Sequence, residues 1–266
     1  MRFKKYFILI NTYWQRGLTH RFTIFAYRIG EMAEILILVL MWTQIYESSA
    51  VISGFTYQQM LTYVLVGNLF QAAVRSWGEQ DVSRHIKDGR LSVFLVKPVS
   101  YLQYIIFQEI GRNSLPSILS VLSQATVIAF FYNRLLIHTN VGMIAVIICM
   151  LAISFFLELL LAFLIGLIAF WTDEVDGLYA TIGRLKKFFS GGYFPLSLLP
   201  ISVAQASFWL PFGYSFYVPT QLFLEKFDIR TGIKGILVQI AWLFILYGII
   251  RFVWQKGIRR YEGVGI

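Results

Sequence analysis

The chain has 266 residues, of which 58% are hydrophobic and only 14% are charged. Soluble domains have about 45–50% apolar and about 25% charged residues, so this composition excludes an ordinary soluble domain and indicates an integral membrane protein. The formal net charge of +9 is explained by basic cytoplasmic loops and requires no nucleic-acid partner.

Residues 3–18 form the first expected element, a basic amphipathic helix. At helical spacing Phe7, Ile10 and Trp14 share one face, and polar and basic residues lie opposite. Such a helix is typical of the membrane interface, where it contacts lipid. We therefore predict an interfacial helix within residues 3–27, with a simple extension of the first span as the alternative.

Six mostly apolar segments follow, and a membrane-spanning helix needs about 20 such residues. They lie near residues 29–47, 57–76, 111–132, 141–170, 176–192 and 233–253, the fifth being short. We predict an all-α integral membrane protein with six transmembrane helices, in which residues 1–266 form a single transmembrane domain.

Basic residues gather before the first span, between the second and third spans, and after the sixth, whereas the alternate loops are poorer in them. Because cytoplasmic loops carry the excess of Lys and Arg, we predict a multi-pass protein of the plasma or inner membrane with both termini in the cytoplasm.

Between the fifth and sixth expected spans, the chain is uncharged yet repeatedly interrupted. The interruptions are Gly191, Gly192, Pro195, Pro200, Pro211 and Pro219. Proline removes a backbone donor and breaks a helix, and broken backbone at membrane depth must be satisfied by protein or by a water-lined cavity. We therefore predict that residues 193–224 enter the outer leaflet and return, as a re-entrant segment before span six.

The basic segment RHIKDGRLSVFLVKP, residues 84–98, lies between the second and third spans. Val82, Ile86 and Val93 predict an apolar stripe on a short cytoplasmic helix, for which Gly89 is a plausible stop and Pro98 sets the entry to the next span. A docking helix and an ordinary basic loop fit this pattern equally well.

Three patterns resemble the type-2 permease subunits of ATP-binding-cassette exporters. They are Ile86-x-x-Gly89-x-Leu91-x-x-x-Leu95-x-Lys97-Pro98, then Phe189-Ser190-Gly191-Gly192-Tyr193-Phe194-Pro195-Leu196-x-x-Leu199-Pro200, and Leu210-Pro211-Phe212 followed by Tyr217-Val218-Pro219. The resemblance covers nearly the whole chain and rests on the order and spacing of the patterns.

The resemblance implies two six-span permeases, the same or unlike, bound to two cytoplasmic ATPase subunits that carry ATP and Mg. It makes residues 78–98 a coupling segment seated in a groove of the ATPase. The residues implied in that role are Arg84, Ile86, Lys87, Gly89, Arg90 and Leu91. The chain has no G-x-x-x-x-G-K-[ST] loop, so we expect it to bind no cofactor and to leave ATP hydrolysis to a partner.

Ionisable residues inside spans are candidates for function. Glu158 lies midway in the fourth span, where a carboxylate costs roughly 2.5–3.5 kcal/mol. We expect Glu158 to pair with Lys186 or Lys187 of the fifth span, and an isolated protonated carboxylate is the alternative. Helical spacing predicts two further pairs, Glu109 with Arg112 and Arg28 with Glu31.

Two other classes of protein are alternatives. Broken helices and intramembrane charges also fit an ion-driven secondary transporter or channel, although no inverted repeat is evident. A membrane enzyme fits poorly, because His20, His85 and His138 are scattered and neither H-E-x-x-H nor G-x-S-x-G occurs. We therefore predict no catalytic residue and no metal site.

Overall fold

The computed structural model describes residues 2–19, 21–76, 78–98, 100–137, 140–172 and 176–261 of the chain. The longer helices are α1 (Arg2–Thr19), α2 (Arg21–Tyr46), α3 (Tyr57–Val74), α4 (Gly78–Lys87), α6 (Tyr101–Phe131), α7 (Val141–Leu167), α8 (Asp176–Phe189), α9 (Ile201–Trp209) and α11 (Ile229–Ile258). The short elements are α5 (Leu91–Leu95), α10 (Tyr217–Phe223), the 3₁₀ helices η1 (Tyr132–Arg134), η2 (Ile168–Phe170), η3 (Leu196–Leu198) and η4 (Pro211–Tyr214), and the strands β1 (Val51–Ile52) and β2 (Phe55–Thr56).

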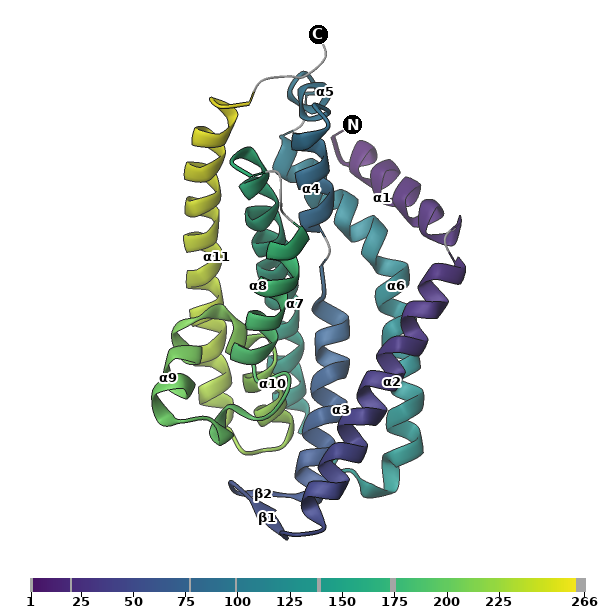
Figure 1. Cartoon of the computed structure of the whole chain (residues 1–266), viewed down its shortest axis with the longest axis vertical. Coiled ribbons are helices and arrows are strands. Elements are labelled where there is room, and N and C mark those ends of the chain that lie inside the picture. Colours follow the sequence, from purple (N-terminus) through teal and green to yellow (C-terminus); the bar gives the residue numbers. More distant parts are fainter. Residues whose placement is uncertain are drawn as a thin grey trace.

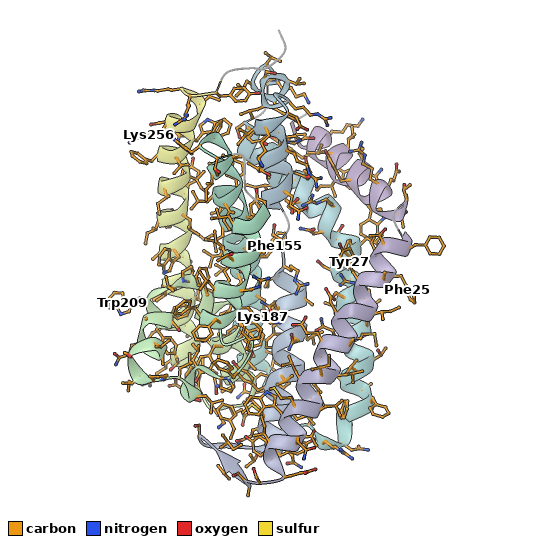
Figure 2. The ribbon with its side chains drawn as sticks, in the orientation of Figure 1. Phe25, Tyr27, Phe155, Lys187, Trp209 and Lys256 are labelled. Carbon is orange, nitrogen blue, oxygen red and sulfur yellow. The ribbon has the colours of Figure 1, made fainter. Side chains whose placement is uncertain are left out.

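These elements form an upright helical bundle (Figure 1). Helix α1 begins and α11 ends near the upper end of the view, where α4 and α5 also lie, and the β1–β2 hairpin lies at the lower end. Aromatic side chains extend from the outside of the bundle, among them Phe25 and Trp209 (Figure 2), and Trp209 is 80% exposed. Such a surface is suited to lipid contact.

Three helices of the described chain are long and apolar enough to cross a membrane, namely Tyr101–Arg134, Val141–Phe170 and Ile229–Ile258. The all-α membrane class is thereby confirmed. The other three expected spans correspond to α2, α3 and α8. With 14 residues, α8 is about 21 Å long, shorter than the roughly 30 Å hydrocarbon core. The count of six spans therefore stays a prediction.

Two boundaries differ from the sequence prediction. Helix α1 ends at Thr19, so the later part of the expected 3–27 segment belongs to α2. Helix α6 begins at Tyr101, about one-third of its length before the expected third span, because the Ser100 side chain caps it by accepting a bond from the backbone of Gln103 at 3.3 Å. The apolar content of a segment does not reveal an N-cap that lies before the apolar run begins.

Helices α7 and α11 make the most extensive contact in the bundle. A Cβ added at Gly235 of α11 would lie 2.9 Å from the Cε atom of Met150 in α7. The buried Gln239 amide donates to Ser154 Oγ at 2.8 Å and to the carbonyl oxygen of Tyr214 at 3.0 Å. Small residues and amide hydrogen bonds are the devices that join helices in lipid.

Helix α1 packs along α6. The ring of Tyr6 stacks on Phe107 with centroids 4.2 Å apart, and Tyr13 Oη lies 2.8 Å from Tyr104 Oη. A Cβ added at Gly111 would lie 2.5 Å from the carbonyl oxygen of Ile10. The glycine therefore sets the distance between the two helices.

Gly111→Ala is expected to push α1 away from α6, because the contacting atom belongs to a backbone that cannot turn aside. Overpacking of this kind costs about 1–3 kcal/mol, and we expect a lower melting temperature in detergent. Gly30→Ala is the matched control, since nothing lies within 4 Å of that position in α2. Equal melting of both variants would contradict the close approach.

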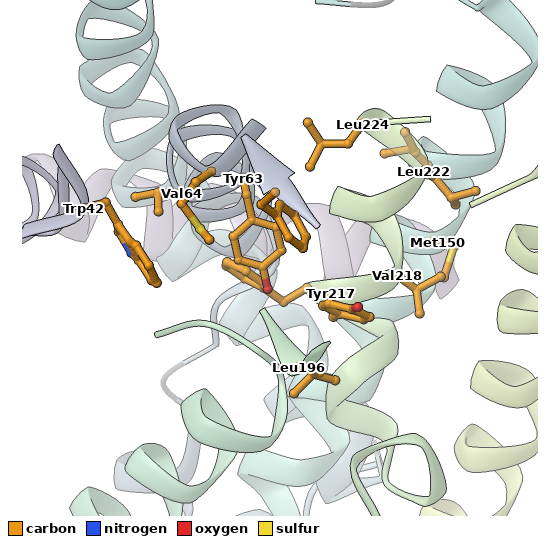
Figure 3. Packing of buried hydrophobic residues seen from close by; sticks show 13 residues of the cluster. Trp42, Tyr63, Val64, Met150, Leu196, Tyr217, Val218, Leu222 and Leu224 are labelled. Carbon is orange, nitrogen blue, oxygen red and sulfur yellow. The ribbon is translucent and has the colours of Figure 1, made fainter. Parts of the chain in front are cut away.

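The lower half of the bundle holds the largest buried apolar cluster of the described residues, where α3, η3 and α10 meet (Figure 3). Tyr63 of α3 lies in this cluster and donates its hydroxyl to the carbonyl oxygen of Gly191 at 2.6 Å. Gly191 has a φ of +80°, a conformation that favours glycine. It ends α8 and turns the chain into η3, α9, η4 and α10, which lie beside the lower part of α11 (Figure 1).

The hairpin between α2 and α3 was not expected from the sequence. Its two-residue turn places Ser53 and Gly54 at φ of +47° and +78°, the arrangement of a type I′ turn. The short strands escaped prediction because each has only two residues.

Candidate functional site

The basic segment between α3 and α6 folds into α4 and α5 at the upper end of the bundle (Figure 1). Helix α4 ends at Lys87, and Gly89 follows with a φ of +71°, so the predicted helix stop is confirmed. The side chains of Val82, Ile86 and Leu91 are buried among residues of α6, α7, η2 and α11.

The exposed face of this segment differs from the predicted one. Val93 is exposed and does not extend the buried stripe of Val82 and Ile86. Ile86 and Leu91 are covered by the chain itself, so they anchor the segment and are not available to touch a partner. Arg84, Lys87 and Arg90 remain exposed.

Aromatic contacts join α5 to the long helices. The Phe94 ring lies 4.6 Å from that of Tyr104 in α6, and Tyr101 of α6 stacks on Trp254 of α11 at 5.4 Å. The Ser92 backbone donates to the hydroxyl of Tyr261 at 3.3 Å. A displacement of α5 would therefore be transmitted to α6 and α11.

His85 lies on the covered side of α4, where its Nδ1 is 2.9 Å from the Tyr101 hydroxyl. Burial lowers the pKa of His85 below its ordinary value. Asp81 opposes this shift, Arg90 adds to it, and Asp88 and Lys97 contribute in opposite senses. The ring is therefore neutral near pH 7.

Acidification is expected to loosen this contact. The unfolded histidine binds more protons than the folded one at pH values from about 6.5 down to the lowered pKa, so its stabilising contribution is lost as pH falls through that window. Melting between about pH 7.5 and about pH 5.5 would measure the effect, with His85→Gln as a control that keeps a polar group near Tyr101 but does not titrate. An identical pH dependence in both proteins would contradict the assignment.

A charged network fixes the start of α4 against α6. Arg112 pairs with both Asp81 at 2.6 Å and Glu109, the pair predicted from spacing. Glu109 has no exposed surface and also accepts from Ser76 at 3.1 Å and Asn113 at 2.8 Å. The network ties the α3–α4 junction and α4 itself to α6.

A second network lies next to the first, at the end of α3. Glu31 of α2 pairs with Arg28 at 2.7 Å, as predicted, and with Arg75 at 2.8 Å. It also accepts from Ser120 of α6 at 2.7 Å. Glu31 thus links α2, α3 and α6.

A cavity of about 580 Å³ lies between the end of α3, the start of α4, α7, α8 and η4. Its described lining residues are Gln71, Val74, Arg75, Ser76, Gln80, Glu158, Tyr179, Ala180, Gly183, Lys186, Lys187, Ser190, Phe212, Ser215 and Phe216. Lys186 pairs with Glu158 across α8 and α7, which decides between the two predicted partners. Lys187, near the centre of Figure 2, pairs instead with Glu34 of α2.

The predicted re-entrant residues are not among the described residues that line this cavity. Gly191, Gly192, Pro195, Pro200 and Pro211 position the turns around η3, α9 and η4. The aromatic wall comes from Phe212 and Phe216, which were not predicted to line a cavity.

The sequence predicts no metal site. Among the described residues, no group of three or more His, Cys, Asp or Glu side chains is placed to hold a metal ion. Two of the three scattered histidines, His20 and His138, lie outside the described residues.

Three long apolar helices, one of which, α7, contributes to a cavity with charged lining residues, define a helical membrane protein with a candidate site. The sequence model of the family described as ABC-2 family transporter protein matches residues 32–265, and the chain belongs to this family. It is therefore a transmembrane permease of the ABC transporter class, and membership of this family implies that it works with an ABC ATPase. A search of curated proteins found no match.

Proposed function

We propose that this chain is the membrane subunit of an ATP-driven exporter and that it forms the substrate pathway without chemistry of its own. The observation that supports this best is the α4–α5 segment, which is anchored by buried Ile86 and Leu91 yet presents exposed Arg84, Lys87 and Arg90. A partner ATPase, which would carry ATP and Mg, would dock on this basic face.

In this proposal, closure of the ATPase moves α4 and α5. The motion passes to α6 and α11 through Tyr101 and Trp254, and to the cavity through the α3–α4 junction. The protein would have six spans in the plasma or inner membrane, with lipid around it. Its termini and α4–α5 would be cytoplasmic, in keeping with Figure 1, where the start of α1, the end of α11 and α4–α5 lie at one end of the bundle. A second permease subunit, the same or unlike, would complete the pathway.

The proposal is tested by a tagged pull-down from native membranes. We expect an ATP-binding subunit to accompany the wild-type chain. Recovery of this subunit is expected to fall at least about tenfold in the variant Arg84→Glu/Lys87→Glu/Arg90→Glu, because complementary charge guides two proteins together and fixes how they dock. Arg134→Glu/Arg230→Glu/Lys234→Glu is the control, since it makes the same charge change at exposed positions outside α4–α5.

Retention of the ATPase by the α4–α5 variant would contradict docking on this face. Recovery of the chain without any ATPase, with transport that continues after ATP hydrolysis is blocked, would favour an ion-driven secondary transporter. A second, unlike permease in the wild-type sample would establish a heteromeric pair.

A further inference from the structure

A second pocket, of about 280 Å³, lies where α5, the start of α6, α7 and the C-terminal part of α11 meet. We call it the α5–α11 pocket, and it shares no described lining residue with the cavity next to α8. Most of its wall is aromatic, from Phe94, Tyr101, Phe163, Tyr247 and Trp254. Arg251 is the one charged side chain among its described lining residues.

Helix α11 presents one face to this pocket. Tyr247, Ile250, Arg251 and Trp254 all line it, and their spacing of three, four and seven residues places them on the same side of a helix. Arg251 is exposed, and none of the ion pairs found between described residues includes it. The described lining residues also include no carboxylate. The pocket therefore combines an apolar wall with a guanidinium group that is open to an anion.

The sequence of α11 places Arg251 at the surface of the membrane. Residues 235–250 carry no charge, and Lys234 and Arg251 are the first charged residues on either side of them. At 1.5 Å per residue these two positions lie about 26 Å apart along the helix, close to the roughly 30 Å of the hydrocarbon core. Tyr247 and Trp254 belong to the residue types that gather at the same level. The guanidinium group therefore lies at the depth of lipid headgroups, at the end of the bundle that holds α5 (Figure 1).

A second cation lies beside the pocket wall. The Nζ atom of Lys97 is 4.3 Å from the ring centroid of Phe94 and 5.5 Å from that of Tyr104. Lys97 is exposed and is not among the described lining residues. Its charge adds to the attraction that Arg251 exerts on an anion.

The size of the pocket suits part of a molecule. Its volume is slightly below the roughly 300–1,000 Å³ of pockets that enclose a whole small ligand. A phospholipid needs only its phosphate and the first part of one acyl chain to be held, because the rest of the lipid stays in the bilayer. Basic pockets between membrane helices on the cytoplasmic side bind anionic headgroups in this way.

We propose that the α5–α11 pocket is a binding site for an anionic phospholipid of the leaflet next to α4 and α5. The lipid phosphate pairs with Arg251, and the first part of one acyl chain lies against Tyr101, Phe163 and Trp254. The bound lipid contacts α5 and α11 together and holds the two elements against each other. This site goes beyond the proposed function and does not depend on an ATPase.

The test uses the full chain in a neutral detergent, together with any ATPase that co-purifies. Native mass spectrometry measures binding of dioleoyl phosphatidylglycerol and of dioleoyl phosphatidylcholine as each is added. We expect phosphatidylglycerol to bind at least about fivefold more tightly, as one Lys or Arg at an anionic membrane surface provides, and to raise the melting temperature. Equal binding of the two lipids would overturn recognition of the anionic headgroup.

The location is tested by substitutions within α11. Arg251→Gln is expected to abolish the preference for phosphatidylglycerol and the rise in melting temperature, and Arg251→Lys is expected to keep most of both. Arg259→Gln is the matched control, because Arg259 is an exposed arginine at the same end of α11 and is not among the described lining residues. An equal loss in Arg259→Gln, or no loss in Arg251→Gln, would overturn the proposed site.

Other occupants give different results. Glycerophosphoglycerol, the same headgroup without acyl chains, is expected not to displace phosphatidylglycerol, and displacement at equal concentration would assign the pocket to a free phosphate ester and overturn the lipid site. A dimer that is lost in Arg251→Gln, without a preference for phosphatidylglycerol in the wild type, would assign the pocket to a second copy of the chain and would also overturn it.

Discussion

Arg112→Met is expected to cause the largest loss of folded protein among single substitutions in the charged networks. Arg112 pairs with Asp81 and with Glu109, and the latter is fully buried. Without the guanidinium, two carboxylates would face each other, and removal of one partner from a buried pair costs about 3–5 kcal/mol. Yield of monodisperse protein and melting temperature would measure the loss.

Arg90→Met provides the matched control for Arg112→Met. Arg90 also pairs with an aspartate, Asp88, but at 3.7 Å and with its side chain 71% exposed, so the expected cost is below about 1 kcal/mol. The triple variant Asp81→Asn/Glu109→Gln/Arg112→Met removes all three charges and should recover part of the loss, because no charge is left unpaired. Equal melting of Arg112→Met and Arg90→Met would contradict the role of the network.

The two pairs within single helices could be predicted because spacing alone brings their members together. Glu109 and Arg112, like Arg28 and Glu31, are three residues apart on one helix, and residues at that spacing share a face. Asp81 with Arg112, by contrast, joins α4 to α6, and nothing in the spacing of residues on separate helices fixes which faces meet. The same limit hid the contact of Lys187 with Glu34.

The apolar pattern of the sequence predicted where helices lie, but it did not predict what their apolar faces contact. Val82 and Ile86 predicted an amphipathic α4, but periodicity does not state whether the apolar face meets a partner or the chain itself. The structure covers that face with α6, α7 and α11, so the surface left for a partner is the basic one. Gly89 was recognisable as a stop because a positive φ favours glycine whatever the tertiary context.

The second large effect is expected at the ion pair between α7 and α8. Glu158→Lys would place a third amine beside Lys186 and Lys187 and leave the cavity without its described lining carboxylate. Insertion scales put the cost of one such charge at roughly 2.5–3.5 kcal/mol. We therefore expect a severe loss of folded, monodisperse protein.

The charge swap Glu158→Lys/Lys186→Glu is expected to restore most of that yield, because it rebuilds the pair with its ends exchanged. Glu158→Lys/Lys187→Glu is the discriminating control, since it restores the net charge equally, but Lys187 is directed to Glu34 on α2. Rescue by the first swap and not by the second would establish that α7 and α8 are joined through Lys186. Equal rescue by both swaps would mean that the yield of folded protein depends only on the total charge at the cavity. The geometry of the Glu158–Lys186 pair would then have no separate role in holding α8 against the bundle.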